Sequence, residues 1–201
     1  MAFEAGQAIL RLIAQMGAFT LNNMATFVEM KSAADVDPLT GIFNKRVLNY
    51  RLGRMLMDAE TNGGQVAVFL FDIDHFKNYN DVNGHVAGDH LLRLLSHLVG
   101  DNIRADDVFG RFGGEEFLLI LPDRSLQEAS QLAESLRREI EGYQFPYGEW
   151  QPLGRLTVSG GVASYPDSAQ NAADLLRAPH PPPSPPTHPP RHHLPPPPDP
   201  P

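Results

Sequence analysis

The hydrophobic pattern predicts a set of short strands around one central strand. Val66 to Phe71 is an unbroken apolar run, which is typical of a strand buried on both faces of a sheet. Apolar runs at Val108-Phe109 and at 117–121 predict two further strands, and 155–164 predicts a fourth. Gly113-Gly114 lies between the second and third runs. A Gly-Gly pair in this position favours a tight hairpin with positive φ at both central residues.

Apolar residues at helical spacing predict helices before, between and after these strands. The predicted helices are 1–31, 39–60, a short helix within 74–84, 86–103, 125–141 and a final one that begins at 171. Ser125 and Glu128 have the spacing of a capping box at the start of one of them. The stretch 143–153 contains Gly and Pro, and we expect it to form a hairpin.

The length of 201 residues fits one domain of typical size with extensions. We expect a helical segment at 1–34, a folded domain at 35–178 and a separate tail at 179–201. In that tail 14 of 23 residues are proline, so it is expected to be disordered or in polyproline II conformation. Its four histidines are irregularly spaced, which argues against a metal site.

Composition excludes several classes of function. The formal net charge of −8 argues against nucleic acid as a partner, because nonspecific binding to nucleic acid needs a basic surface. The chain has no cysteine, which excludes disulfides and thiolate metal sites. No apolar run reaches the ~18 residues of a membrane span, and the first residues lack the basic region of a signal peptide. We therefore expect a cytoplasmic protein.

Acidic residues follow the central strand and the glycine pair. Asp72 and Asp74 come at the end of the buried run, and Glu115 and Glu116 directly follow Gly114. Carboxylates that face one another across a sheet end form a hard-oxygen site suited to Mg²⁺, which usually also binds substrate phosphates. The sequence therefore predicts nucleotide chemistry. The alternative is a solvated hairpin with incidental charge.

Other polar residues have both a functional and a structural interpretation. Lys77 and Asn80 follow Asp72 closely enough to point back over the strand end. Asp89, predicted in the first turn of its helix, would interact with the helix dipole or accept hydrogen bonds from a base edge. Gly84 and Gly88 are expected to leave open space there, which favours the second role. His85 follows the same logic, although a lone histidine is more often structural.

Several blocks occur together in an order that resembles one known family. Residues 72–81, 84–89 and 111–117 are similar to the signature blocks of the GGDEF family of diguanylate cyclases. Asp37-Pro38-Leu39-Thr40-Gly41, followed by Asn44-Lys45-Arg46, resembles the first motif of that family. The resemblance extends from about 37 to about 177. It implies an α+β fold that is ferredoxin-like and similar to a polymerase palm, with a mainly antiparallel sheet and helices on one side and flanking it.

The resemblance also implies an activity. Family members condense two GTP into cyclic di-GMP and release two pyrophosphates, with Mg²⁺ or possibly Mn²⁺ as cofactor. Each subunit of a homodimer holds one GTP. The helix predicted at 1–31 would then dimerise or transmit a signal, or it would be the last helix of an upstream sensory domain.

Site residues follow from the matching motifs. The implied metal ligands are Asp72, the Ile73 carbonyl and Glu115. Glu115 would also be the base, and Lys77 would stabilise charge on the phosphates. The residues implied to contact substrate are Asn80, His85, Asp89, Gly113, Gly114 and Glu116. Arg104 and Asp107 resemble the family's inhibitory product site, whereas a helix-terminal ion pair is the structural alternative.

The sequence departs from the family pattern after Ala178. A D-x-A-L-Y-x-A-K motif and a G-R-N strand are expected there, but prolines and histidines follow instead. A frameshift is one hypothesis. The departure implies fewer cations at the GTP phosphates and a less covered core, so we expect weak stability and impaired catalysis. The alternative function is a non-catalytic regulatory module that binds GTP or cyclic di-GMP. A polymerase palm is disfavoured by the acidic charge and short length.

Overall fold

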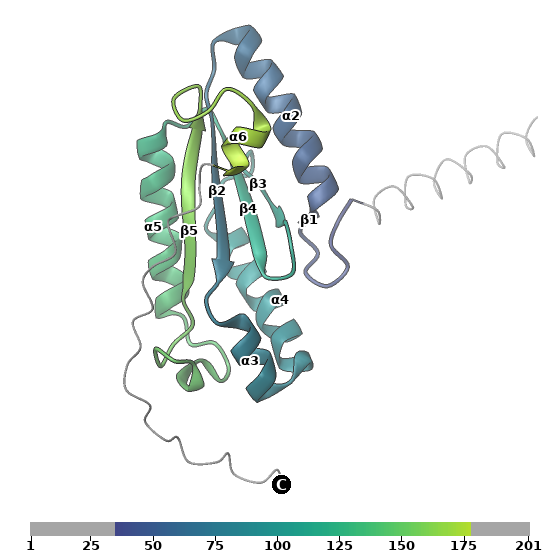
Figure 1. The fold of residues 1–201 in the computed structure, drawn as a ribbon, viewed down its shortest axis with the longest axis vertical. Helices are drawn as coiled ribbons and strands as arrows, with labels where there is room; N and C mark the ends of the chain where they lie inside the picture. The colour runs from purple at the N-terminus through teal and green to yellow at the C-terminus, as the bar shows by residue number, and fades with distance from the viewer. Residues whose placement is uncertain (1–34, 178–201) are drawn as a thin grey trace, which may run out of the picture.

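The computed structural model describes residues 35–177 (Figure 1). Its elements are β1 (Phe43–Asn44), α2 (Lys45–Asn62), β2 (Val66–Ile73), α3 (Phe76–Asn83), α4 (His85–Asp101), β3 (Val108–Arg111), β4 (Glu116–Pro122), α5 (Leu126–Gly142), the 3₁₀ helix η1 (Gly148–Trp150), β5 (Val158–Tyr165) and α6 (Ala172–Arg177). The helix predicted at 1–31 and the tail predicted at 179–201 lie outside the described residues.

The strands form one five-stranded sheet in the order β1-β3-β4-β2-β5. Strand β2 pairs antiparallel with β4 on one side and with β5 on the other, and β3 pairs antiparallel with β4. Only the two-residue strand β1 runs parallel to its neighbour, β3. The prediction of a mainly antiparallel sheet in an α+β fold is therefore confirmed.

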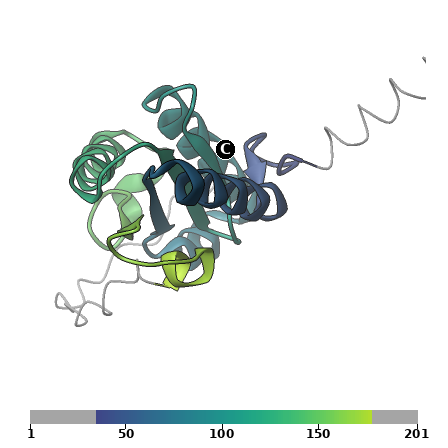
Figure 2. The same cartoon turned by 90° about the horizontal axis from the view of Figure 1, so that it is seen from above.

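Strand β2 contributes to two hydrophobic cores. Its alternate residues Ala67, Phe69 and Phe71 pack in a core with α4 and α5. Val66, Val68 and Leu70 pack in a second core with α2 and α6. The prediction that β2 is buried on both faces is confirmed, and helices cover both faces of the sheet rather than one (Figure 2).

Two predicted elements differ from the structure. Helix α2 begins at Lys45 rather than at 39, because residues 37–41 form a turn and the Asn44 side chain accepts a hydrogen bond from the Val47 N–H. Residues 143–153 do not form a hairpin. They contain η1 and are held against α3 by a 2.8 Å hydrogen bond from the Tyr79 hydroxyl to the Pro146 carbonyl.

The other helices agree with the pattern. The capping box of Ser125 and Glu128 is present at the start of α5. Helix α6 ends the described chain, and its Leu175 is fully buried in the core beside α2. None of the helices within residues 35–177 combines the length and the hydrophobicity that crossing a bilayer requires.

Candidate active site

The end of β2 and the start of β4 bring the predicted carboxylates together. Asp72 lies directly opposite Glu116 in the antiparallel register of β2 and β4. One residue further, the Ile73 N–H donates a 3.4 Å hydrogen bond to the Glu115 carbonyl. The acid that ends the first buried strand and those that follow the glycine pair are therefore neighbours across one sheet edge, as the sequence predicts.

Asp72 is in an unfavourable electrostatic environment. Burial, together with the negative charges of Glu115, Glu116 and Asp74, raises the pKa of Asp72 to about 6 from an ordinary value of 3.8. Its Oδ1 atom is buried and has no hydrogen-bond partner among the described residues. A buried acceptor without a partner beside like charges is the arrangement that a cation would relieve.

The donor set fits a magnesium ion. Within residues 35–177 no three ligating side chains are already arranged around a metal position. Mg²⁺ does not require such a cage, because it is usually bound by one or two carboxylates together with water and substrate phosphates. Asp72 and the Ile73 carbonyl at the end of β2, together with Glu115 just before β4, meet that requirement, and the unpartnered Asp72 oxygen supports it.

The Gly-Gly loop differs from the predicted turn. Neither Gly113 nor Gly114 has a positive φ. Instead, the Phe112 and Gly113 N–H groups both donate to the Glu116 carbonyl, at 2.8 and 3.2 Å. A Cβ added at Gly113 would overlap the Glu116 carboxylate and lie 3.2 Å from its Cδ. Glycine at 113 leaves room for the Glu116 carboxylate in its present position, while Gly114 faces open space.

Helices α3 and α4 pack closely where Asn80 meets Gly88. A Cβ added at Gly88 would overlap the Asn80 Oδ1 atom and lie 2.9 Å from its Cγ. The expectation of open space at Gly88 is therefore wrong, because the Asn80 side chain fills it. Asn80 Oδ1 is buried and has no hydrogen-bond partner. Space is open only at Gly84, whose φ is 82°.

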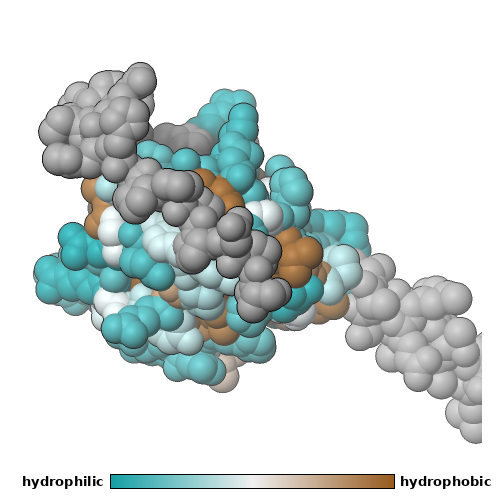
Figure 3. Space-filling view, turned by 90° about the horizontal axis from the view of Figure 1, so that it is seen from below, coloured by the Kyte–Doolittle hydropathy of each residue, from teal (hydrophilic) through white to brown (hydrophobic). Residues whose placement is uncertain are grey.

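The remaining predicted contacts with substrate are exposed. Lys77 lies in the first turn of α3, and His85 is the first residue of α4. Asp89 lies beyond the first turn of α4, which contains no acidic residue, so the predicted interaction with the helix dipole loses its basis. Figure 3 shows the molecule from below, the end toward which β2 runs, and the surface that is not grey there is mainly hydrophilic.

Comparison with known proteins identifies the family. Residues 34–180 match the sequence profile described as "Diguanylate cyclase, GGDEF domain". The chain belongs to the GGDEF family. The GGDEF domain is 35% identical over 156 residues to the response regulator PleD of Caulobacter vibrioides, covering 78% of this chain and 34% of PleD. It is 36% identical over 150 residues to the diguanylate cyclase DgcP of Pseudomonas aeruginosa, covering 75% of this chain and 22% of DgcP.

Solved structures agree with this assignment. The coiled coil and GGDEF domain of DgcB from Caulobacter crescentus, in complex with c-di-GMP, matches with a TM-score of 0.75 and 26% identity, covering 83% of this chain and 87% of that chain. The diguanylate cyclase SiaD of Pseudomonas aeruginosa, in complex with its activator SiaC, matches with a TM-score of 0.63 and 28% identity, covering 88% and 70%. The chain spans only about a third or less of the length of PleD and DgcP.

Arg104 and Asp107 of the GGDEF domain are not paired through their side chains. The Asp107 carboxylate is 1% exposed and forms an ion pair with Arg124 at 2.9 Å. It also accepts a 2.8 Å hydrogen bond from the Arg104 backbone N–H, while the Arg104 side chain is exposed. A helix-terminal ion pair of Arg104 with Asp107 is therefore not formed. Sequence reasoning missed Arg124, which belongs to no motif.

A second missed contact joins the end of β2 to β5. The Thr157 hydroxyl donates a 2.6 Å hydrogen bond to the Asp74 carboxylate, and the Asp74 N–H donates to the Thr157 carbonyl at 3.0 Å. These bonds hold the turn that carries His75, which has a φ of 59°, ahead of α3. The motif contained Asp74, but its partner lies 83 residues away and carries no local signal.

Replacing Gly88 by alanine is expected to weaken GTP binding and stability together. The new methyl group would displace the Asn80 side chain, and such overpacking costs about 1–3 kcal/mol of unfolding free energy. Urea denaturation and titration with a non-hydrolysable GTP analogue measure the two effects. Gly100→Ala is the matched control. It lies in the same helix with open space around it, and we expect it to be neutral or to stabilise by about 0.5–1 kcal/mol. Equal behaviour of the two variants would contradict the prediction.

Proposed function

We propose that this GGDEF domain is a magnesium-dependent diguanylate cyclase that condenses two GTP into cyclic di-GMP. The observation that carries the proposal is the cluster of Asp72, Glu115 and Glu116 at one sheet edge, with the unpartnered Asp72 oxygen inside it. A binding module would not need these carboxylates to be held together against their mutual repulsion. The substrate is a cytoplasmic nucleotide, which fits a cytoplasmic location.

In the proposed site Asp72, the Ile73 carbonyl and Glu115 would hold the metal, and Glu116 would support it or the ribose. When bound, the metal would supply positive charge for the phosphates. Glu115 accepts the proton of the 3′-hydroxyl of one GTP. That oxygen forms a bond to the α-phosphorus of the other GTP while the bond to the leaving pyrophosphate breaks. The same step repeated with the roles exchanged closes the ring and releases the second pyrophosphate.

The other residues position the nucleotide. Lys77, exposed in the first turn of α3, stabilises the charge of the phosphates. Asn80, His85 and Asp89 read the guanine and sugar, and the open space at Gly114 admits the nucleotide to the loop. Each domain holds one GTP, so a homodimer is required for reaction. Arg104, whose side chain is exposed, binds product for inhibition, and the buried Asp107 fixes the turn that presents it.

We further propose that turnover by this chain is impaired. Residues 179–201 do not contain the D-x-A-L-Y-x-A-K and G-R-N motifs, whose lysine and arginine the family uses at the phosphates. The six-residue helix α6 is the last described element, and it buries Leu175 in the core that it shares with α2. Fewer cations near the triphosphate raise the barrier to its transfer. An upstream sensory domain or an activating partner would act on the catalytic domain through the helix predicted at 1–31.

An assay of product formation tests the proposal directly. Purified protein incubated with GTP and Mg²⁺ is expected to form cyclic di-GMP slowly, with two pyrophosphates for each product, and to form none in EDTA. A variant in which residues 178–201 are replaced by the family's D-x-A-L-Y-x-A-K segment is expected to be faster. Absence of product from both proteins, although both bind GTP, would overturn the enzymatic proposal. Equal and rapid turnover by both would overturn the impairment alone.

A further inference from the structure

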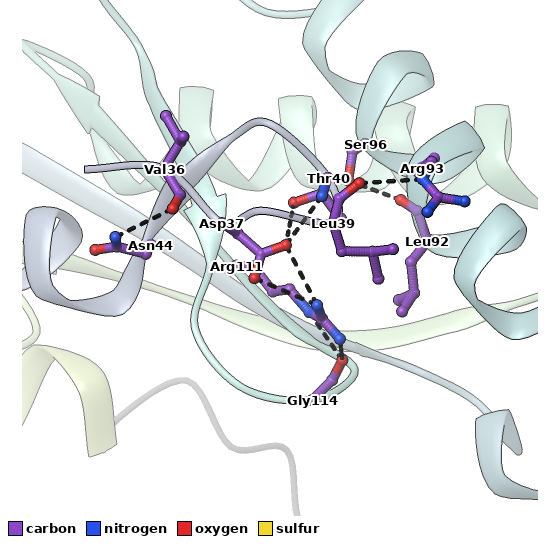
Figure 4. A network of polar contacts seen from close by, with 10 residues as sticks. All are labelled: Val36, Asp37, Leu39, Thr40, Asn44, Leu92, Arg93, Ser96, Arg111 and Gly114. Carbon is purple, nitrogen blue, oxygen red and sulfur yellow. Dashed lines mark hydrogen bonds and ion pairs between the residues drawn. The ribbon is translucent and has the colours of Figure 1, made fainter. Parts of the chain in front are cut away.

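The turn formed by residues 37–41, which we call the Asp37 turn, is a rigid element. The Asp37 Oδ1 atom accepts hydrogen bonds from the Thr40 N–H at 3.0 Å and from the Thr40 hydroxyl at 2.8 Å. The Gly41 N–H donates to the Asp37 carbonyl at 2.9 Å. From α4, Arg93 Nε donates to the Leu39 carbonyl at 3.2 Å (Figure 4). The turn is therefore closed on itself and fixed to the domain.

Arg111 connects this turn to the Gly-Gly loop. Its Nη1 lies 3.3 Å from Asp37 Oδ1 and 3.4 Å from Oδ2. On the other side, Nε and Nη2 both donate to the Gly114 carbonyl, at 3.0 and 2.6 Å. Figure 4 shows Arg111 between Asp37 and Gly114. The Arg111 guanidinium therefore bonds both to Asp37, which lies 74 positions earlier in the sequence, and to Gly114, which lies three positions later.

The connection is shielded and charged. The side chains of Arg111 and Asp37 are only 17% and 18% exposed. Although burial opposes ionisation, hydrogen bonds from Thr40 and the charge of Arg111 keep the pKa of Asp37 below its ordinary value of 3.8. An ion pair that is largely buried and has both groups charged keeps its geometry better than an exposed surface pair, which contributes little to stability.

A second contact joins the same two regions. Lys45, the first residue of α2, places its Nζ 4.2 Å from the ring centre of Phe112. Phe112 is next to Arg111 and immediately precedes Gly113. Arg111 and Phe112, which precede the Gly-Gly pair, are thus contacted by residues between the Asp37 turn and the first residue of α2.

Fixing the Gly114 carbonyl fixes the peptide that leads to Glu115. The Glu115 carbonyl is held in turn by the Ile73 N–H at 3.4 Å. Both peptide groups that flank the Glu115 Cα are thereby restrained, one by Arg111 and one by β2. We propose that Arg111 is a positioning residue for Glu115, and that the Asp37 turn sets the position of Arg111. The domain's N-terminal segment thereby controls the geometry of the loop. This inference rests on the proposed role of Glu115 in catalysis.

Two substitutions test the connection without removing the turn. Asp37→Asn removes the charge that holds Arg111 but keeps an oxygen that can accept from Thr40. Arg111→Lys keeps a positive charge but lacks the planar fork that reaches Asp37 and Gly114 at once. Asp35→Asn is the matched control, because Asp35 pairs with Arg46, outside the loop, from two residues before Asp37.

The expected result is a specific effect on turnover. Asp37→Asn and Arg111→Lys should lower kcat by about 10- to 100-fold, because misplacing a reacting group by about 1 Å is enough to do so. KM for GTP should change by no more than about threefold, since the lost positioning acts on the chemical step. The double variant should be no slower than the slower single variant, because the two residues act as one unit. Asp35→Asn should match the unsubstituted protein.

Hydrogen exchange gives a readout that does not require activity. Amides of residues 112–116 should exchange faster in both test variants, while amides of β2 and the urea midpoint stay unchanged. Unchanged exchange of the loop in both variants would overturn the inference, whatever the activity. A uniform rise in exchange with an equal loss of stability would also overturn it, since the role would then be merely structural. If the unsubstituted protein makes no product, the proposed function fails and exchange alone decides the positioning of the loop.

Discussion

Glu115→Gln is expected to abolish cyclic di-GMP formation while leaving product binding intact. Loss of a positioned general base typically costs about 10²–10⁴-fold in rate. Arg104 and Asp107 lie outside the Gly-Gly loop, so affinity for labelled cyclic di-GMP should stay within about twofold, as expected for independent sites. Chromatographic quantification of product and a fluorescence binding titration measure the two quantities.

The control and the contrary outcome are equally specific. Glu139→Gln removes an exposed carboxylate of α5 that belongs to none of the predicted site residues, and it should change neither quantity. If Glu115→Gln turned over GTP as fast as the unsubstituted protein, Glu115 would not be the base. If neither protein made product and both bound cyclic di-GMP, the domain would be the regulatory module that is the alternative function.

Asp72→Asn is expected to make the protein inactive and more stable. Activity should fall by about 10²-fold or more, because a preorganised electrostatic group is lost from the phosphate site. In the presence of EDTA the unfolding free energy at pH 8 should rise by about 1–3 kcal/mol, after discounting for solvent around a half-buried group. Asparagine removes the charge that burial disfavours first and that the carboxylates of Glu115 and Glu116 repel.

The pH dependence of this gain follows from the raised pKa. The pKa of Asp72 is about 6 in the folded protein and 3.8 ordinarily, so the folded state takes up a proton first as the pH falls. The stability that this carboxyl contributes is fully present below about pH 3.8 and is lost as the pH rises through about 6. The advantage of Asp72→Asn should therefore be largest above pH 7 and should disappear near pH 4. Urea denaturation over this range measures it, with the exposed Asp58→Asn as control. A gain that does not vary with pH would contradict the assigned cause.

The central strand and its acids could be predicted because their signals are local. Six consecutive apolar residues from Val66 to Phe71 require burial on both faces, and the motif places Asp72 at their end. The capping box of α5 was equally readable, because Ser125 and Glu128 satisfy each other within one turn. Such features depend on residues that are close along the chain.

The reasons for the glycines could not be predicted, because they depend on tertiary contacts. A positive φ was predicted for Gly113, yet its φ is not positive, and the room left by its missing side chain is taken by the Glu116 carboxylate. Gly88 was assigned to open space, yet the Asn80 side chain from another helix fills it. The partner of Asp107 is Arg124, 17 residues away and outside every motif. The motifs identify these residues, but the side chains that contact them are determined by tertiary packing.

Because β2 is buried on both faces, the two parts of the candidate site, Asp72 on β2 and the loop that carries Glu115, differ in rigidity. Asp72 stands at the end of a strand that belongs to both hydrophobic cores, so displacing it means opening the whole domain. Gly113 to Glu115, in contrast, have no buried side chain and are tied down by a few hydrogen bonds. The position of Asp72 is therefore as stable as the fold, whereas the loop can move when only a few hydrogen bonds break. Any adjustment of the proposed ligands therefore falls to the loop rather than to β2.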